Sequence, residues 1–162
     1  MIPGFTQGWL ARAFTLLEVM VVIIVIGILA AVVVPRFGGV TEDAKSSALQ
    51  GALGGVRSSI ASFRAKAVIS GTTSFPTTAQ LTSVGTVVQQ AIPKNPYNGL
   101  NTVQEVSTGA AAARTVSGAD QYGWNYWVDN SSTPPQCVFY ANTDAATTVS
   151  DGSGGFKGAN EL

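Results

Sequence analysis

The chain has 162 residues, of which 46% are hydrophobic and only 11% are charged, with lysine plus arginine equal in number to aspartate plus glutamate. This length allows one domain with an appendage. The sequence has no net charge and no basic stripe of the kind that nucleic-acid-binding proteins carry, so we expect no nucleic-acid partner. The absence of histidine removes the commonest general base and the commonest zinc ligand.

The first element is an apolar run from Phe14 to Val34, in which only Thr15 and Glu18 are notably polar. A helix rising about 1.5 Å per residue would extend the run over roughly 31 Å, which matches the hydrocarbon core of a bilayer. β-Branched residues also suit a buried strand, but the run exceeds the usual strand length of about 3–10 residues. Unpaired backbone groups are costly in lipid, so we expect a membrane helix over residues 14–35.

A conventional secretory signal peptide fits this segment poorly. The apolar stretch exceeds the usual length of about 7–15 residues, and no A-x-A cleavage site follows it. Small residues precede it instead, at Ala11 and Ala13. Basic residues flank both ends, so the positive-inside rule does not decide the orientation. The short leader and the polar bulk after the run place the N-terminus in the cytoplasm.

Glu18 is an ionisable residue near the start of this apolar segment. A carboxylate costs about 2.5–3.5 kcal/mol at the centre of a membrane helix and less near its end. One interpretation is that Glu18 reaches back to water and favours the positive end of the helix dipole. The other is that it pairs with a cation of another subunit, because opposite charges attract strongly at low dielectric and are costly unpaired. Such a pair would set the axial register between staggered neighbours.

The segment 13–18, with the apolar run, Gly27 and Pro35 after it, resembles the N-terminus of type IV prepilins and type II secretion pseudopilins. The resemblance implies cleavage by prepilin peptidase between Ala13 and Phe14, N-methylation of Phe14, and an assembly role for Glu18. Pro35 occupies the place of the family's helix-kinking proline. The sequence departs from the family in one respect, since Ala13 stands where glycine usually precedes the cut.

The chain is thus expected to have four parts. Residues 1–13 form a prepilin leader, 14–35 a transmembrane or assembly helix, 36–70 an amphipathic continuation of the helix, and 71–162 a loop-rich region with an antiparallel β head.

The amphipathic part begins after a predicted break or kink at Pro35, and Thr41-Glu42-Asp43-Ala44 looks like a fresh helical start. Apolar residues then recur at spacings of three and four, at Leu49, Leu53, Val56, Ile60, Phe63 and Ala67. We interpret this stripe as packing on the chain's own sheet, which stays compatible with some contact to another subunit. Ser70-Gly71-Thr72-Thr73 predicts the end of the helix.

The head begins with a loop-rich stretch. Residues 81–91 fit either a short helix or an irregular strand, and residues 93–99 form a turn cluster. Residues 122–128 and 136–141 are rich in aromatic and β-branched residues and are separated by a polar turn, so they predict an antiparallel hairpin. A sheet of three or four strands against the long helix would give a small α+β, pilin-like head.

Three features of the head each leave two interpretations open. Trp124, Tyr126 and Trp127 form either a stacking platform or the core of the sheet. Cys137, the single cysteine, is either a buried inert thiol or a partner for a second chain. Asp144 and Asp151 either bind Ca²⁺ through oxygen ligands or belong to a solvated tail. No other feature calls for a cofactor.

We expect a structural subunit of a type II secretion pseudopilus or a type IV pilus-like filament, not an enzyme, because no nucleophile–base pair, metal cluster or phosphate loop is visible. The resemblance implies five kinds of partner: further copies of the chain, other pilins or pseudopilins, prepilin peptidase, an inner-membrane assembly platform and membrane lipid. It also implies a single pass through the bacterial inner membrane, with the C-terminal domain periplasmic and the assembled filament periplasmic or extracellular. The alternative is a minor or tip pilin that binds a surface, a secreted substrate or DNA.

Overall fold

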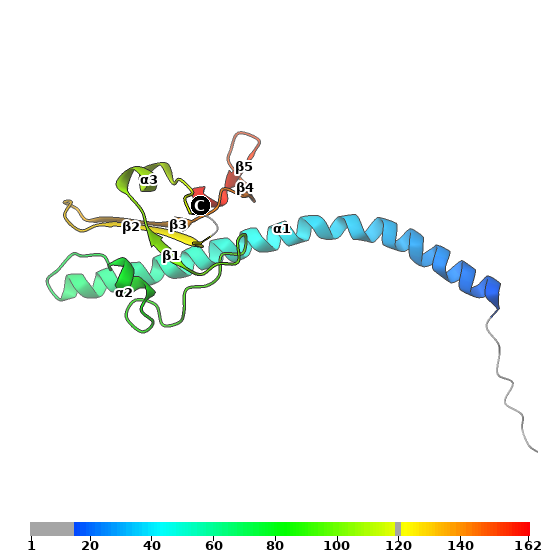
Figure 1. Cartoon of the computed structure of the whole chain (residues 1–162), viewed down its shortest axis with the longest axis horizontal. Helices are drawn as coiled ribbons and strands as arrows, with labels where there is room; N and C mark the ends of the chain where they lie inside the picture. The colour runs from blue at the N-terminus through cyan, green and yellow to red at the C-terminus, as the bar shows by residue number, and fades with distance from the viewer. Residues whose placement is uncertain (1–14, 119–120) are drawn as a thin grey trace, which may run out of the picture. The chain divides into compact units, whose positions relative to one another are not determined.

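The computed structural model describes residues 15–118 and 121–162, except for the side chains of residues 35–38. The chain divides into two compact units, Met1–Gly39 and Val40–Leu162, which are described separately. One helix, α1, runs from Leu16 to Ile69 and so contributes to both units (Figure 1).

Helix α1 continues through Pro35 without interruption. The predicted break there, and the fresh helical start at Thr41, are therefore wrong. Proline removes one backbone donor, but the turns on either side retain their own hydrogen bonds, so a helix with favourable sequence on both sides can continue. A bend of the helix at Pro35 stays a prediction.

In the first unit the apolar side chains of α1 are exposed. Ile23 is 60% exposed, Leu29 59% and Val34 68%. The most apolar window of 18 residues in α1 has a mean hydropathy of 3.1, and none of it is buried within the chain. Judged by length and composition, α1 is the one helix in the described residues that is able to cross a membrane.

In the second unit α1 buries the predicted stripe. Leu49, Leu53, Val56 and Ile60 are all 3% exposed or less, and they join one hydrophobic cluster with residues of the sheet. The helix ends as predicted around Ser70. Gly71 adopts a positive φ of 82°, its N–H bonds to the carbonyl of Val68, and Thr72 N–H bonds to that of Ala67. This is a Schellman cap, which satisfies the last carbonyls of a helix.

A three-stranded sheet lies beside this part of α1 (Figure 1). The predicted hairpin is confirmed, since β2 (Trp124–Asp129) pairs antiparallel with β3 (Gln136–Ala141). The third strand, β1 (Val103–Glu105), pairs parallel with β2, so the sheet is mixed where we expected an antiparallel one. The α+β class is confirmed.

Short elements complete the head. Helix α2 (Thr78–Thr82) reaches only the start of the stretch 81–91, and residues 83–91 are turn and loop, so the helix or strand expected over that stretch does not form. Helix α3 (Thr108–Ala113) lies on the face of the sheet opposite α1 (Figure 1). The tail is more ordered than predicted. It forms β4 (Ala146–Ser150) and β5 (Phe156–Gly158), which pair antiparallel, and a short 3₁₀-helix, η1 (Ala159–Glu161).

The turn cluster at residues 93–99 fastens the loop region to the sheet. Asn95 is fully buried and donates through Nδ2 to the carbonyl of Gly123 at 2.9 Å. Trp124 donates through Nε1 to the carbonyl of Pro93 at 2.9 Å. Gly123 has no room for a side chain, because a Cβ built there would lie 2.0 Å from the carbonyl oxygen of Leu100. Glycine at this position thus permits the loop to approach the start of β2 closely.

Candidate functional site in the N-terminal helix

Residues 15–18 are the described part of the predicted assembly segment 13–18, and they contain a capped helix start. Thr15 precedes α1, and its Oγ1 accepts a hydrogen bond from the backbone N–H of Glu18 at 3.2 Å. A threonine side chain at this position satisfies one of the donors that a helix start leaves without a partner. Thr15 and Glu18 also have the spacing of a capping box, a signal for the helix start that our sequence reading did not use.

The side chain of Glu18 is exposed and makes no hydrogen bond or ion pair within the described residues. The backbone N–H of Glu18, by contrast, bonds to both the carbonyl and Oγ1 of Thr15. A carboxylate inside an apolar segment is stabilised when it faces the positive end of its helix and when it finds a cation. The geometry leaves that second partner to come from outside the described part of the chain.

The other residues predicted to act in processing and assembly lie partly or wholly outside the described part of the chain. Ala13 and Phe14, the predicted cleavage pair, and with them the methylation at Phe14, fall outside the described residues. Pro35 lies within α1, and its side chain is also outside the description.

The aromatic cluster of the head is core. Trp124 and Tyr126 are fully buried, and Trp124 stacks on Phe139 with ring centroids 5.3 Å apart. The hydroxyl of Tyr126 donates to the carbonyl of Pro76 at 2.7 Å. Buried rings cannot serve as a stacking platform for a ligand, so that interpretation is wrong for these two residues. Trp127 is half-buried.

Cys137 is half-buried and packs against the core cluster. Burial raises the pKa of its thiol, and the nearby charge of Arg64 opposes that shift in part. A raised pKa keeps the thiol protonated at neutral pH, which lowers its reactivity. This environment favours the inert interpretation over pairing with a second chain.

The two candidate calcium ligands are not part of a recognisable metal site. Asp151 uses Oδ1 to accept hydrogen bonds from the backbone N–H groups of Ser153 at 2.7 Å and Gly155 at 3.0 Å, which closes the turn between β4 and β5. Residues 15–118 and 121–162 contain no cluster of three or more Asp, Glu, His or Cys side chains suited to a metal, so Asp144 and Asp151 belong to none. Calcium binding at these residues stays a prediction.

Comparison with known proteins agrees with the N-terminal motif. Residues 10–34 match the family described as the prokaryotic N-terminal methylation motif. The chain is also 42% identical over 60 residues to the type IV narrow pilus major component PilA5 of Thermus thermophilus, a match covering 36% of this chain and 52% of that protein. The chain thus spans about half the length of this relative. No solved structure matches the chain.

The resemblance of the N-terminal segment to type IV prepilins is therefore confirmed. The motif match covers the predicted cleavage pair, Glu18 and the whole apolar run from Phe14 to Val34. The chain carries the N-terminal methylation motif of prokaryotic pilins and is similar to a type IV pilin.

Proposed function

We propose that the chain is a structural subunit of a type IV pilus-like filament, assembled through α1 and without enzymatic activity. The observation that carries the proposal is an exposed apolar helix that lies within the methylation-motif match and on which the carboxylate of Glu18 has no partner among the described residues. A filament gives that surface neighbours, and a membrane gives it lipid before assembly. The relative, named as the major component of a narrow pilus, favours a pilus over a secretion pseudopilus.

In this proposal prepilin peptidase cuts between Ala13 and Phe14 and methylates Phe14. Glu18 then meets the new terminal amine of a neighbouring subunit. Before assembly the chain crosses the bacterial inner membrane once, with the head in the periplasm, and an inner-membrane platform adds it to other pilins. The buried state of Trp124 and Tyr126 disfavours the tip-pilin alternative, because it removes the surface that would have stacked on a ligand.

Mass spectrometry of the protein extracted from membranes tests the processing. We expect an N-terminus at methylated Phe14. A chain that keeps Met1 in cells with an active prepilin peptidase would contradict the proposal. Because glycine usually stands before the cut, Ala13→Gly should be processed at least as fast as the parent chain, and a pulse-chase experiment measures the two rates.

Substitution of Glu18 tests the assembly step separately. Glu18→Ala should still be processed but should not enter filaments, because the terminal amine of its neighbour would lose its counter-charge. Glu42→Ala is the matched control, since Glu42 forms an exposed ion pair with Lys45 at 2.9 Å, a kind of pair that contributes little. Filaments that incorporate both variants equally would remove the register role from Glu18.

We also propose a test for calcium at the tail. Thermal unfolding of chelator-treated protein should be unaffected by added Ca²⁺ if the loop of Asp151 is a plain solvated turn. An increase of several degrees that disappears in both Asp144→Asn and Asp151→Asn would establish a metal site.

A further inference from the structure

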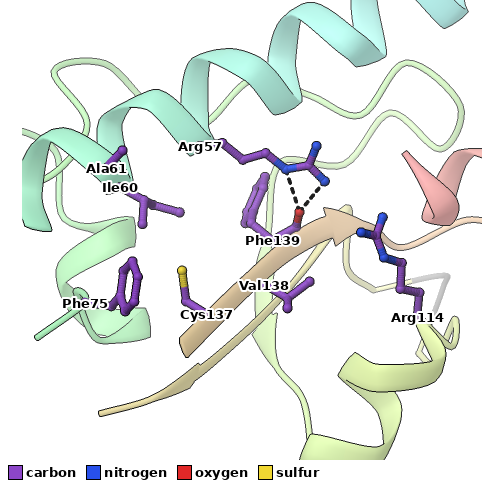
Figure 2. A pocket seen from close by; sticks show the side chains of 8 residues that line it. All are labelled: Arg57, Ile60, Ala61, Phe75, Arg114, Cys137, Val138 and Phe139. Atoms are coloured by element: carbon purple, nitrogen blue, oxygen red, sulfur yellow. Dashed lines mark hydrogen bonds between the residues drawn. The ribbon is translucent and has the colours of Figure 1, made fainter. Parts of the chain in front are cut away.

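Polar side chains join distant segments of the head at two places. At the first, Arg57 of α1 donates through Nε and Nη2 to the carbonyl of Phe139, at 3.1 and 2.9 Å (Figure 2). Arg57 and Arg114 also donate to the main-chain oxygen of Leu162, at 2.7 and 3.1 Å. The second place is the turn that contains Asn98. A guanidinium does not react with its own backbone, whereas asparagine is a thermolabile residue, so the second junction has a chemistry that the first lacks.

Asn98 and Gly99 form the single Asn-Gly pair of the sequence. In an unfolded chain the backbone nitrogen of Gly99 can attack Cγ of Asn98. The new N–Cγ bond forms, the Cγ–Nδ2 bond breaks, and ammonia leaves with the proton of the attacking nitrogen. Water then opens the cyclic imide to aspartate or isoaspartate. Glycine favours the attack because it has no side chain and its backbone is conformationally free.

In the folded head the attacking nitrogen is already engaged. The N–H of Gly99 donates to the carbonyl of Asn95 at 2.7 Å, and Gly99 adopts a positive φ of 74°. Asn95 is itself fully buried, and its own N–H donates to the carbonyl of Leu100 at 2.8 Å. The nitrogen must therefore lose a short hydrogen bond within an anchored turn before it can attack Asn98.

The side-chain amide of Asn98 is held at both of its ends. Its Nδ2 donates to the carbonyls of Tyr122 at 3.1 Å and Asn142 at 3.4 Å. Its Oδ1 accepts from the backbone N–H of Leu100 at 3.1 Å. Because the amide is half-buried and bonded to three backbone groups, it cannot turn toward the nitrogen of Gly99 while the turn is intact.

Deamidation would remove the donor that this junction uses. A carboxylate has no N–H group, so it would face the carbonyl oxygens of Tyr122 and Asn142 with nothing to donate. Leaving such groups without partners is costly. The isoaspartate product would also add a carbon to the main chain between Asn98 and Gly99, which displaces the N–H groups of Gly99 and Leu100 from their acceptors. The modified turn would therefore not return to its native form.

We propose that Asn98 is a fold-dependent modification site. The folded head blocks deamidation of Asn98, and unfolding permits it. The reaction needs only water, and its product prevents the native turn from forming again. A head that stays unfolded for long enough is thereby made permanently unable to refold to full stability.

The rate of deamidation in the two states tests the first half of this proposal. The full chain is incubated in non-ionic detergent at mildly alkaline pH, with and without guanidinium chloride, and the acid form of each asparagine is followed by peptide mass spectrometry. We expect Asn98 to react at least about a hundredfold more slowly in the folded chain, because attack then requires opening of the turn. Asn101, which is exposed and precedes Thr102, is the internal control and should react slowly at similar rates in both states. Equal rates at Asn98 would overturn the protection.

Two measurements test the consequence for refolding. Asn98→Asp should lower the melting temperature of the head by several degrees, whereas Asn101→Asp adds the same charge at an exposed position and should melt as the parent chain does. Independently of whether Asn98→Asp folds, parent chain aged in guanidinium chloride is refolded by dilution and treated briefly with protease. Chains deamidated at Asn98 should be enriched in the digested fraction. An equal share of them in the digested and resistant fractions, or an Asn98→Asp variant that melts as the parent does, would overturn this half of the proposal.

Discussion

The two ends of α1 use the same kinds of residue to opposite effect. Leu29, in the first unit, is 59% exposed, whereas Leu53, in the second, is 2% exposed. Both are leucines of one continuous helix. The second half carries apolar residues on one stripe and has a sheet to cover it, while the first half is apolar all round and has nothing in the described chain to cover it. Exposed apolar area of this extent indicates a partner outside the chain.

The largest expected effect tests this comparison directly. Leu53→Ala should lower the free energy of unfolding of the head by about 2–5 kcal/mol, because it opens a cavity in the core. Leu29→Ala makes the same chemical change at an exposed position and should leave head stability within about 0.5 kcal/mol of the parent. Chemical unfolding in detergent, followed by tryptophan fluorescence, measures both. Equal losses would contradict the contrast between an exposed first half and a buried second half of α1.

A second matched pair compares two glycines. Gly123→Ala should destabilise the head by about 1–3 kcal/mol, since the added methyl group would collide with the carbonyl of Leu100. Gly54→Ala, on α1, meets nothing within 4 Å and should stabilise the chain by up to about 1 kcal/mol through helix propensity. Thermal unfolding measures the two shifts. If Gly54→Ala stabilised the chain but blocked filament entry, that open surface would be identified as a contact between subunits.

The smallest expected effect is a decrease in the stability of the head at acidic pH. The pKa of Asp129 is held below its ordinary value of 3.8, mainly by the hydroxyl and backbone N–H of Ser131. Because the folded pKa is depressed, the resulting stability is present above the unfolded pKa and is lost as the pH falls through the folded one. A slight decrease in head stability is therefore expected only below about pH 4. Asp129→Asn should flatten this part of the pH profile, and an unchanged profile would assign the acid sensitivity elsewhere.

Much of the fold could be predicted because it depends on local patterns. The spacing of Leu49, Leu53, Val56 and Ile60 predicted a buried helical stripe, and the two aromatic strands predicted a hairpin. The break at Pro35 was wrong because a missing donor is a local penalty that the rest of the helix can absorb. The parallel pairing of β1 was missed because Val103 and Trp124 are brought together only by a crossover.

The candidate assembly site was predictable for the same reason. The polar residues of the segment 13–18 stand out against an apolar run, so the sequence predicts a helix with a carboxylate near its start, and the resemblance to prepilins implies processing there. The meeting of Arg57 and Arg114 at the main-chain oxygen of Leu162 has no comparable signal in the local sequence. Arg57, Arg114 and Leu162 are far apart in the chain, and each is an ordinary residue in its own segment.

The sequence by itself determined the exposed N-terminal helix, its capped start at Thr15 and the position of Glu18, because a helix with an unbroken apolar run is specified by neighbours one to four residues apart. Only the tertiary structure decided that Trp124 and Tyr126 are core, that Asn95 is buried against Gly123, and that two arginines share one oxygen. Those outcomes depend on contacts between distant segments, which local propensity does not encode.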